Sequence, residues 1–339
     1  MLQYKDKVLV AVSGGSDSIG LVLLLLALKE KYKIKISIAH LNHMLRKEES
    51  LRDQIFVENF AKNNSLTFYC KQIDVKTHAQ KHKLSIEQAG RKLRYDYFQH
   101  LTAQHGFTKI AMGHNKNDNA ELVLMNLLRG SGPKGLSGIP PIRDGIYIRP
   151  LIRTSKEQIL DFLNSYNQKF MFDSSNNDIS YLRNKIRCKL LVHLESEFNP
   201  EIIEALDRLS NILKSEEDYF EIETQKAFDS CLFKKENSSV SLFKKKISNL
   251  HPALLNRVLR KTIKLTKNDL NKITLSHIND IINFCFNTSS GNSIDLPGQI
   301  RVYKKNEIII VKKEKRPLRD IGKKAKAEYR AAQNKSIQQ

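Results

Sequence analysis

Several features that this 339-residue chain lacks exclude whole classes of protein. None of its four cysteines stands in a C-x-x-C pair: Cys70, Cys188, Cys231 and Cys285. Their spacing fits neither a zinc site nor an iron–sulfur cluster, so we expect core residues or incidental thiols. The apolar run from Ile19 to Leu28 is too short to cross a bilayer, and residues 1–7 contain no signal-peptide stretch. We therefore expect no membrane contact and a cytoplasmic location.

The chain also lacks the two common nucleotide-binding motifs and is poor in acidic residues. Neither the G-x-x-x-x-G-K-[ST] loop nor G-x-G-x-x-G occurs in it. Its 36 Asp and Glu residues stand against 57 Lys and Arg, which gives a net charge of +21. Such an excess favours a polyanionic partner, because Lys and Arg displace counterions from phosphates. A generally Lys-rich composition would produce the same excess, so the charge alone leaves nucleic acid open.

Six residues near the start of the chain, Ser13-Gly14-Gly15-Ser16-Asp17-Ser18, predict an anion site. The β-branched run before them is typical of a buried strand, and the Leu-rich run after them of a buried helix. A glycine turn between strand and helix directs backbone N–H groups at one spot. We expect Gly14 and Gly15 to take positive φ and admit a phosphate, and Asp17 to hold a divalent ion. An ordinary βα turn is the alternative.

The first part of the chain alternates between strand and helix patterns. Strands are expected near residues 8–12, 35–41, 66–73, 109–113 and 146–148, and helices near 19–28, 50–63, 85–105, 117–129, 154–167 and 181–194. This alternation predicts an α/β fold with a doubly wound, mostly parallel sheet and helices on both faces. Ligands of such sheets bind beyond the carboxyl ends of the strands. A Gly/Pro-rich loop is expected at 130–141.

From Glu201 onward the pattern becomes helical. Helices are expected near 202–233, 251–265 and 276–286, followed by a hairpin of residues 300–303 and 308–311 that turns at Lys305-Asn306. We interpret this part as a smaller helical or α+β domain. The predicted domains are 1–198 and 199–314, followed by a basic tail at 315–339. The last 28 residues carry ten Lys or Arg against three Asp or Glu, so we expect a disordered tail, free in solvent or bound to RNA.

Polar residues gather after the second predicted strand, in the stretch His40-Leu41-Asn42-His43. An adenine or ribose would lie at this place in a doubly wound fold. A polar loop with incidental histidines is the alternative, and metal binding lacks nearby carboxylates.

The fourth predicted strand leads into a second polar stretch. Gly113 leaves room for a ligand there, and Asp118 and Glu121 share one face of the helix that follows. The two carboxylates either bind Mg²⁺ or a substrate ammonium group, or simply complement the helix dipole.

Two helices carry pairs of arginines about one turn apart. Arg91 and Arg94 lie in the helix expected near 85–105, and Arg183 and Arg187 lie in the one near 181–194. Guanidinium groups at this spacing suit phosphate contacts or a leaving pyrophosphate. A solvated basic face is the alternative for each helix.

The strand followed by S-G-G-x-D-S resembles the pyrophosphate (PP) loop of N-type ATP pyrophosphatases. The other motifs, taken in order over about residues 5–312, resemble the tRNA(Ile)-lysidine synthetase family. The Asp118-x-x-Glu121 helix start and the L-L-R-G-S-G run at 127–132 are the most specific of them. The remaining matching segments are 40–46, 91–95, Gly113-His114, 135–136, 149–151, 173–177, 183–187, 290–291, 296–298 and 301–302.

The resemblance implies an adenine nucleotide alpha hydrolase-like fold and a ligase that modifies tRNA. ATP with Mg²⁺ would bind at Ser13–Ser18, with His40 and Gly113 as further contacts and Asp17 on the metal. Cytidine 34, the wobble base in the CAU anticodon of tRNA(Ile), would be adenylated with release of pyrophosphate. Free L-lysine would then displace AMP and form lysidine, which changes the codon that is read from AUG to AUA.

The resemblance also implies roles for individual residues. Asp17, His114, Asp118 and Glu121 would be catalytic, with Asp118 and Glu121 orienting lysine or accepting its proton. Phosphate contacts to tRNA would be made by five arginines: Arg91, Arg94, Arg129, Arg183 and Arg187. By the same resemblance, domain 1–198 would bind ATP and carry the catalytic residues, and domain 199–314 would bind tRNA. A homodimer is compatible with the resemblance.

The chain departs from the family pattern at Gly90, Asn115 and Asn117, which affects fine substrate contacts, and many relatives continue with a further domain after Val311. A tRNA thiolation enzyme is the nearest alternative, but such enzymes generally need paired cysteines. The positive charge disfavours a small-molecule ligase. Intact Asp17, Asp118 and Glu121 disfavour a non-catalytic RNA-binding protein.

Overall fold

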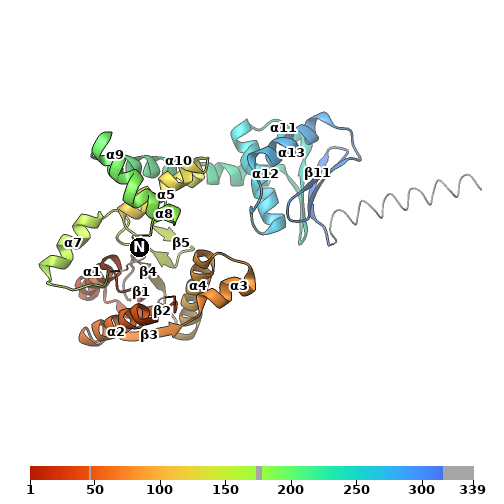
Figure 1. Cartoon of the computed structure of the whole chain (residues 1–339). Coiled ribbons are helices and arrows are strands. Elements are labelled where there is room, and N and C mark those ends of the chain that lie inside the picture. The colour runs from red at the N-terminus through yellow and green to blue at the C-terminus, as the bar shows by residue number, and fades with distance from the viewer. Residues whose placement is uncertain (46, 173–177, 316–339) are drawn as a thin grey trace, which may run out of the picture. The chain divides into compact units, whose positions relative to one another are not determined.

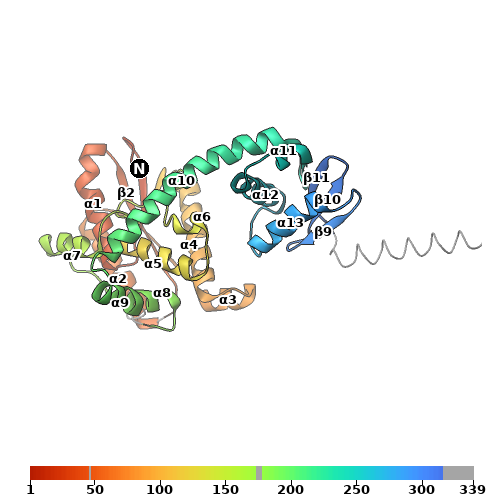
Figure 2. The ribbon, with the colours of Figure 1, turned by 90° about the horizontal axis from the view of Figure 1, so that it is seen from above.

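The chain divides into two compact units, Met1–Ser215 and Glu216–Gln339. A computed structural model describes residues 1–45, 47–172 and 178–315 (Figure 1). Arg46, the matching stretch 173–177 and the basic tail beyond residue 315 therefore lie outside the described residues. The division falls inside helix α10 (Ile202–Cys231), whereas the sequence placed a domain boundary before this helix, at 198/199. Figure 2 shows α10 as one continuous helix.

The first unit contains a six-stranded sheet with the order β3-β2-β1-β4-β6-β5. All neighbouring strands are parallel except β5 and β6, which are antiparallel. The strands are β1 (Lys7–Ala11), β2 (Lys35–Asn42), β3 (Thr67–Gln72), β4 (Lys109–Met112), β5 (Ile142–Arg143) and β6 (Tyr147–Ile148). This topology confirms the predicted α/β fold.

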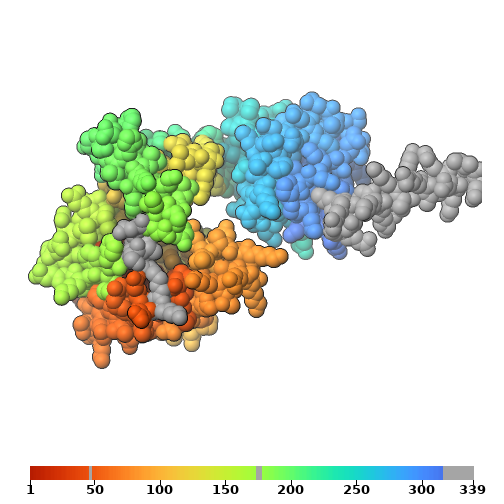
Figure 3. Space-filling model, in the orientation of Figure 1, coloured from red at the N-terminus to blue at the C-terminus, as the bar shows by residue number. Residues whose placement is uncertain are grey.

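Helices connect these strands. They are α1 (Ser16–Tyr32), α2 (Lys47–Asn63), α3 (Val75–His82), α4 (Ile86–His105), α5 (Lys116–Leu128), α6 (Pro133–Leu136), α7 (Lys156–Ser165), α8 (Leu182–Lys185), the π-helical segment η2 (Ile186–Leu191) and α9 (Val192–Glu197). The sequence did not predict α3 and α6. It also placed the start of α7 at Thr154, but Ser155 is the cap, because its hydroxyl accepts from the Gln158 N–H in a capping box. In the space-filling view, α2–α4 and α7–α9 form much of the visible surface of this unit (Figure 3).

Side chains of β1 alternate between two apolar layers, as strand geometry requires. Val8 and Val10 pack with α1, α2 and α7 on one face of the sheet. Leu9 packs with Phe98 and other residues of α4 on the opposite face. Because all three β1 side chains are fully buried, the carboxyl end of this central strand, where the PP loop begins, is held firmly between two layers.

The second unit is built on a five-stranded antiparallel sheet with the order β7-β8-β11-β10-β9. Its elements after α10 are β7 (Leu232–Glu236), β8 (Ser239–Phe243), α11 (Lys244–Ser248), α12 (Pro252–Lys267), α13 (Leu275–Asn287), β9 (Ser293–Leu296), β10 (Ile300–Lys305) and β11 (Ile308–Lys313). The predicted hairpin is confirmed as β10–β11. Since Lys305 pairs with Ile308, the hairpin turns at Asn306-Glu307, one residue later than predicted. The strands β7, β8 and β9 were not predicted.

Within the described residues, no helix combines the length and the apolar composition needed to cross a bilayer.

Candidate active site

The PP loop joins β1 to α1 and is closed by its own serines. The Ser13 N–H donates to Ser18 Oγ at 3.2 Å, and that hydroxyl donates to the Gly15 carbonyl at 2.9 Å. Gly14 has a φ of +98°, which favours glycine, as predicted. The prediction of positive φ for Gly15 was wrong: its φ is −74°, because Gly15 has the extended backbone of the α1 N-cap.

The first turn of α1 is suited to an anion. Gly15 caps the helix without a side-chain acceptor, so the loop supplies backbone N–H groups at the positive end of the helix dipole. The Asp17 side chain is 31% exposed beside this turn. A single carboxylate next to a phosphate site fits Mg²⁺, which is usually held by one or two carboxylates and by phosphate oxygens. In the described part of the chain, no three His, Cys, Asp or Glu side chains gather to hold a metal by themselves.

Gly113 follows the end of β4 and lies against the first turn of α1. A Cβ at this position would lie 3.1 Å from the backbone carbonyl of Asp17 and 3.2 Å from the Ser18 nitrogen. From the sequence, Gly113 is predicted to leave space for a ligand. The structure adds that its missing side chain lets α1 approach β4.

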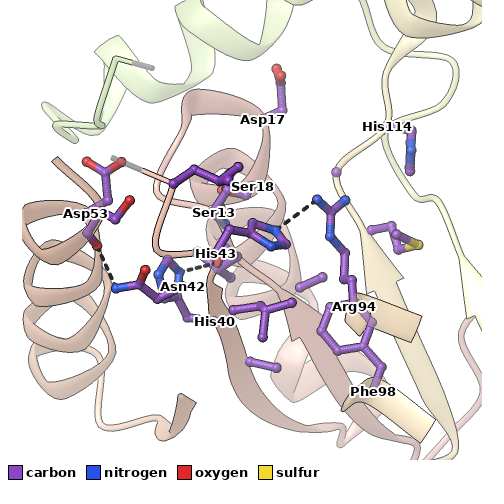
Figure 4. A pocket seen from close by; sticks show the side chains of 18 of the residues that line it. Ser13, Asp17, Ser18, His40, Asn42, His43, Asp53, Arg94, Phe98 and His114 are labelled. Atoms are coloured by element: carbon purple, nitrogen blue, oxygen red, sulfur yellow. Dashed lines mark hydrogen bonds between the residues drawn. The ribbon is translucent and has the colours of Figure 1, made fainter. Parts of the chain in front are cut away.

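A cavity of about 510 Å³ opens beside the PP loop, above the carboxyl ends of β1, β2 and β4 (Figure 4). It brings together nine of the predicted site residues: Ser13, Asp17, Ser18, His40, Arg94, Gly113, His114, Asp118 and Arg183. Residues outside the predicted set also line it, among them Asn42, His43, Asp53, Phe98 and Met112. Phe98, Met112 and Leu41 give this polar cavity an apolar floor.

Two histidines of this cavity are held in defined orientations. The His40 ring bonds through Nδ1 to the Val12 carbonyl at 2.8 Å, so Nδ1 is the donor. Nη2 of Arg94 lies 3.4 Å from Nε2 of His43. Because a guanidinium only donates, Nε2 of neutral His43 accepts and Nδ1 carries the proton. Burial, together with the charges of Arg94 and His40, lowers the pKa of His43 to about 4.

His114 is also neutral at physiological pH. Burial and four surrounding guanidinium groups lower its pKa to about 3: those of Arg149, Arg183, Arg91 and Arg94. The Nδ1 atoms of His114 and His43 are buried and have no hydrogen-bond partner among the described residues. Both rings therefore offer a polar atom that a bound ligand can satisfy.

Asp118, Glu121, Arg183 and Arg187 form one ion-pair cluster rather than separate sites. Arg183 Nε donates to Glu121 Oε2 at 2.7 Å, and Arg183 Nη2 donates to Asp118 Oδ1 at 2.8 Å. Arg187 bonds both oxygens of Glu121, and its Nη2 lies 3.4 Å from Asp118 Oδ1. Glu121 is 1% exposed and Asp118 15%, whereas each arginine is 38% exposed. The carboxylates thus hold two guanidinium groups that still face solvent.

The helix that carries both acids is fixed at its start. Asn115 caps α5: its side chain accepts from the Asp118 N–H at 2.9 Å, and Asp118 accepts from the Asn115 N–H at 3.1 Å. Asp118 therefore caps the helix and binds arginine at the same time. Asn119, 1% exposed, donates to Ser210 and Asp207 of α10 and accepts from the Ile139 N–H. These bonds set the rotation of α5 and with it the direction of the acidic face.

A second cavity, of about 670 Å³, adjoins the same loop. It shares Ser13, Asp17, Ser18 and Asp53 with the first cavity. Its polar lining includes Asn115, Asn117, Glu121, Lys156 and Arg187, and its apolar lining includes Leu160, Phe170, Met171 and Leu191. Arg91 and Arg129 line neither cavity, and both side chains are exposed.

Lys156 is a polar residue of this cavity that was not predicted from the sequence, as is Asp53. Its Nζ lies 2.7 Å from Asp17 Oδ1 and 2.6 Å from Ser16 Oγ. A signal was present in the sequence, because a lysine directly after a helix cap is at the unfavourable end of the dipole.

Comparison with known proteins first defines the class. A family model described as a PP-loop domain matches residues 3–194. The loop, the parallel sheet and the two cavities thus belong to an ATP-dependent PP-loop protein.

Two relatives then identify the particular family. The chain is 38% identical to a tRNA(Ile)-lysidine synthase of Clostridioides difficile (strain 630), over 93% of this chain and 68% of that protein. It is 37% identical to a tRNA(Ile)-lysidine synthase of Clostridium tetani (strain Massachusetts / E88), over 89% of this chain and 64% of that protein. The chain belongs to the tRNA(Ile)-lysidine synthase family, as its motifs predicted, and it spans about two thirds of the length of these relatives.

A solved structure supports the fold. A U34-tRNA thiolase of Methanococcus maripaludis, which carries a [4Fe-4S] cluster, aligns with a TM-score of 0.52 over 63% of this chain and 73% of that chain. At 15% identity, this likeness shows the fold alone. The names of the more similar relatives do not favour the thiolation alternative. Cys70 and Cys188 are exposed, whereas Cys231 and Cys285 are buried.

Proposed function

We propose that this chain ligates free L-lysine to C2 of cytidine 34 in the CAU anticodon of tRNA(Ile). Family membership supports the reaction. The structural observation that carries the proposal is that two chemically different cavities share the PP-loop residues Ser13, Asp17 and Ser18. A nucleotide lying on this loop would present its α-phosphorus between the two cavities. One cavity can then hold the adenosine, while the acceptor approaches from another side.

In the first step, O2 of the cytidine would attack the α-phosphorus of ATP. A P–O bond to the base forms, the bond between the α-phosphorus and the bridging oxygen breaks, and pyrophosphate leaves. His40, His43 and the apolar floor of the first cavity would bind the adenosine, and the loop N–H groups would bind the phosphates. His114, which is neutral, would offer a hydrogen bond to the nucleotide or the base but not an acidic proton.

In the second step, the ε-amine of lysine would attack C2. A C–N bond forms, the C2–O bond breaks, and AMP leaves with that oxygen, while the nitrogen loses a proton. Asp118 is the more exposed carboxylate of the acid pair, so we assign it the contact with the amine. Glu121 would hold Arg183 and Arg187 in place, and these arginines would bind the phosphate groups of ATP and of its products.

Asp17 is the residue that would hold Mg²⁺. A bound Mg²⁺ ion would offset negative charge on the phosphates. The exposed Arg91 and Arg129, outside both cavities, would contact the tRNA backbone. A homodimer and a cytoplasmic location stay predictions, and light scattering of the purified chain tests the first.

One experiment tests the proposed function. The protein is incubated with ATP, labelled lysine and a tRNA(Ile) transcript, and AMP release and label on the tRNA are measured. We expect one AMP for each lysine attached, and neither with a transcript in which cytidine 34 is replaced by uridine. Modification that depends on a sulfur donor instead of lysine would contradict the proposal. Asp17→Asn is the inactive control, because it removes the metal-binding charge.

A further inference from the structure

The PP loop contains no lysine in its own sequence, yet the fold places one against it. The Nζ atom of Lys156 reaches Ser16 Oγ at 2.6 Å and Asp17 Oδ1 at 2.7 Å, from a helix 139 positions further along the chain. Asp17 points away from His40 and His43 in Figure 4, which leaves its carboxylate on the side of Lys156. An ammonium group therefore lies beside the first turn of α1, the turn to which the proposed function assigns the phosphates of a nucleotide.

The backbone around Lys156 is built to hold it there. Lys156 is the first residue of α7, and its N–H donates to the Asn117 side chain at 2.9 Å. The Lys116 N–H donates in turn to the Thr154 carbonyl at 3.0 Å. Further along, Ile159 of α7 packs against Gly20 of α1, where a Cβ would be only 3.0 Å away. These contacts tie α7 to both helices that form the site, α1 and α5.

The positive charge of Lys156 does not stabilise α7. A cation in the first turn opposes the helix dipole, so the position costs stability unless an anion compensates for it. Asp17 compensates, but the two side chains are 38% and 31% exposed, and an ion pair this exposed contributes little to stability. A weak pair of this kind can be exchanged for a ligand at small cost.

We propose that Lys156 is the phosphate-binding lysine of this PP loop. Without nucleotide, its ammonium group neutralises Asp17. When nucleotide and divalent cation bind, Lys156 releases the Asp17 carboxylate to the cation and moves to a non-bridging oxygen of the β- or γ-phosphate. This inference rests on the proposed function, because it requires that the loop binds the pyrophosphate part of ATP. Under this proposal, Lys156 contacts the phosphates of the substrate ATP directly.

The test uses binding without turnover. Inorganic pyrophosphate is titrated into the full chain by calorimetry, and Mn²⁺ binding without nucleotide is followed by electron paramagnetic resonance. For Lys156→Met we expect pyrophosphate to bind about tenfold more weakly, as for one lost charge-assisted contact. We expect Mn²⁺ to bind several-fold more tightly, because no ammonium competes for Asp17. Lys156→Arg should keep most of the pyrophosphate affinity.

Lys62→Met is the matched control, since it removes one exposed lysine from α2 of the same unit. It should change neither affinity. Pyrophosphate binding by Lys156→Met equal to that of the parent would overturn the inference and leave Lys156 a counterion of Asp17. Weaker binding of both pyrophosphate and Mn²⁺ would also overturn it. Failure of the unaltered chain to bind pyrophosphate would instead reject the loop assignment on which the proposed function depends.

Discussion

Gly113 lies directly against the backbone of Asp17, so that a Cβ on Gly113 would stand 3.1 Å from the Asp17 carbonyl oxygen. The neighbouring atoms are backbone and cannot rotate away. We expect Gly113→Ala to shift the first turn of α1, to cost about 1–3 kcal/mol of stability and to weaken ATP binding at least about tenfold. Thermal unfolding and ATP titration measure the two effects. Gly132→Ala is the control, because nothing lies within 4 Å of a Cβ there. The prediction would be contradicted if Gly113→Ala bound ATP as tightly as the parent chain.

Alanine substitutions at the two loop glycines should have different effects. Gly14 has a φ of +98°, so Gly14→Ala forces an alanine into a strained backbone and should cost about 1–3 kcal/mol. Gly15 has an ordinary φ of −74°, and a Cβ there meets its nearest neighbour at 3.7 Å. We therefore expect Gly15→Ala to keep its melting temperature but to bind ATP more weakly, because a methyl group would crowd the phosphate. An equal loss of stability in both variants would show that the backbone at Gly15 does not accommodate alanine without strain.

Glu121→Gln tests the ion-pair cluster. The amide would leave Arg183 and Arg187 with Asp118 as their remaining carboxylate, and its NH₂ group would face their N–H groups. We expect a loss of about 1–3 kcal/mol, below the full value for a buried pair because the arginines are partly exposed. The rate of lysine transfer should fall by a larger factor than the affinity for ATP. Glu204→Gln is the control, since Glu204 is 42% exposed in its pair with Lys116 and its loss should change stability by less than about 1 kcal/mol.

The buried histidines make the stability of the protein depend on pH. The pKa of His43 is lowered to about 4 and that of His114 to about 3, whereas both would be near 6.5 in the unfolded chain. The unfolded state therefore takes up protons first as the pH falls below 6.5, and the folded state loses stability by up to about 1.4 kcal/mol per pH unit for each histidine. Urea unfolding at pH 7 and pH 5 should show this loss. His114→Asn should reduce it, and an unchanged pH dependence in that variant would contradict the assignment.

The parts of the site that follow from local pattern were predictable. The PP loop, the start of α5 and the shared face of Asp118 and Glu121 depend on residues within a few positions of each other. The alternation of strands and helices was enough to predict the parallel sheet, because few topologies accommodate it.

The parts that depend on distant partners were not predictable. The sequence assigned Asp118 and Glu121 to one role and Arg183 and Arg187 to another, but folding joins them into one cluster. Partner choice across more than 60 positions depends on the packing of α5 against η2, which no local pattern encodes. The strand β7 was missed for a different reason: its exposed Lys and Glu residues lack the alternation of a half-buried strand, and Leu232 and Phe233 follow the apolar pattern of α10.

The hydrogen bonds of Asn119 have a practical consequence for fragments of this chain. A catalytic fragment cut at the predicted boundary, residue 198, would discard Asp207 and Ser210. The buried amide of Asn119 would then lose both acceptors, one residue away from Asp118 and two from Glu121. Truncation should therefore loosen the acidic helix even though every proposed catalytic side chain is retained. A fragment that ends at Ser215 keeps both bonds, so we expect its acidic helix to be held as it is in the whole chain.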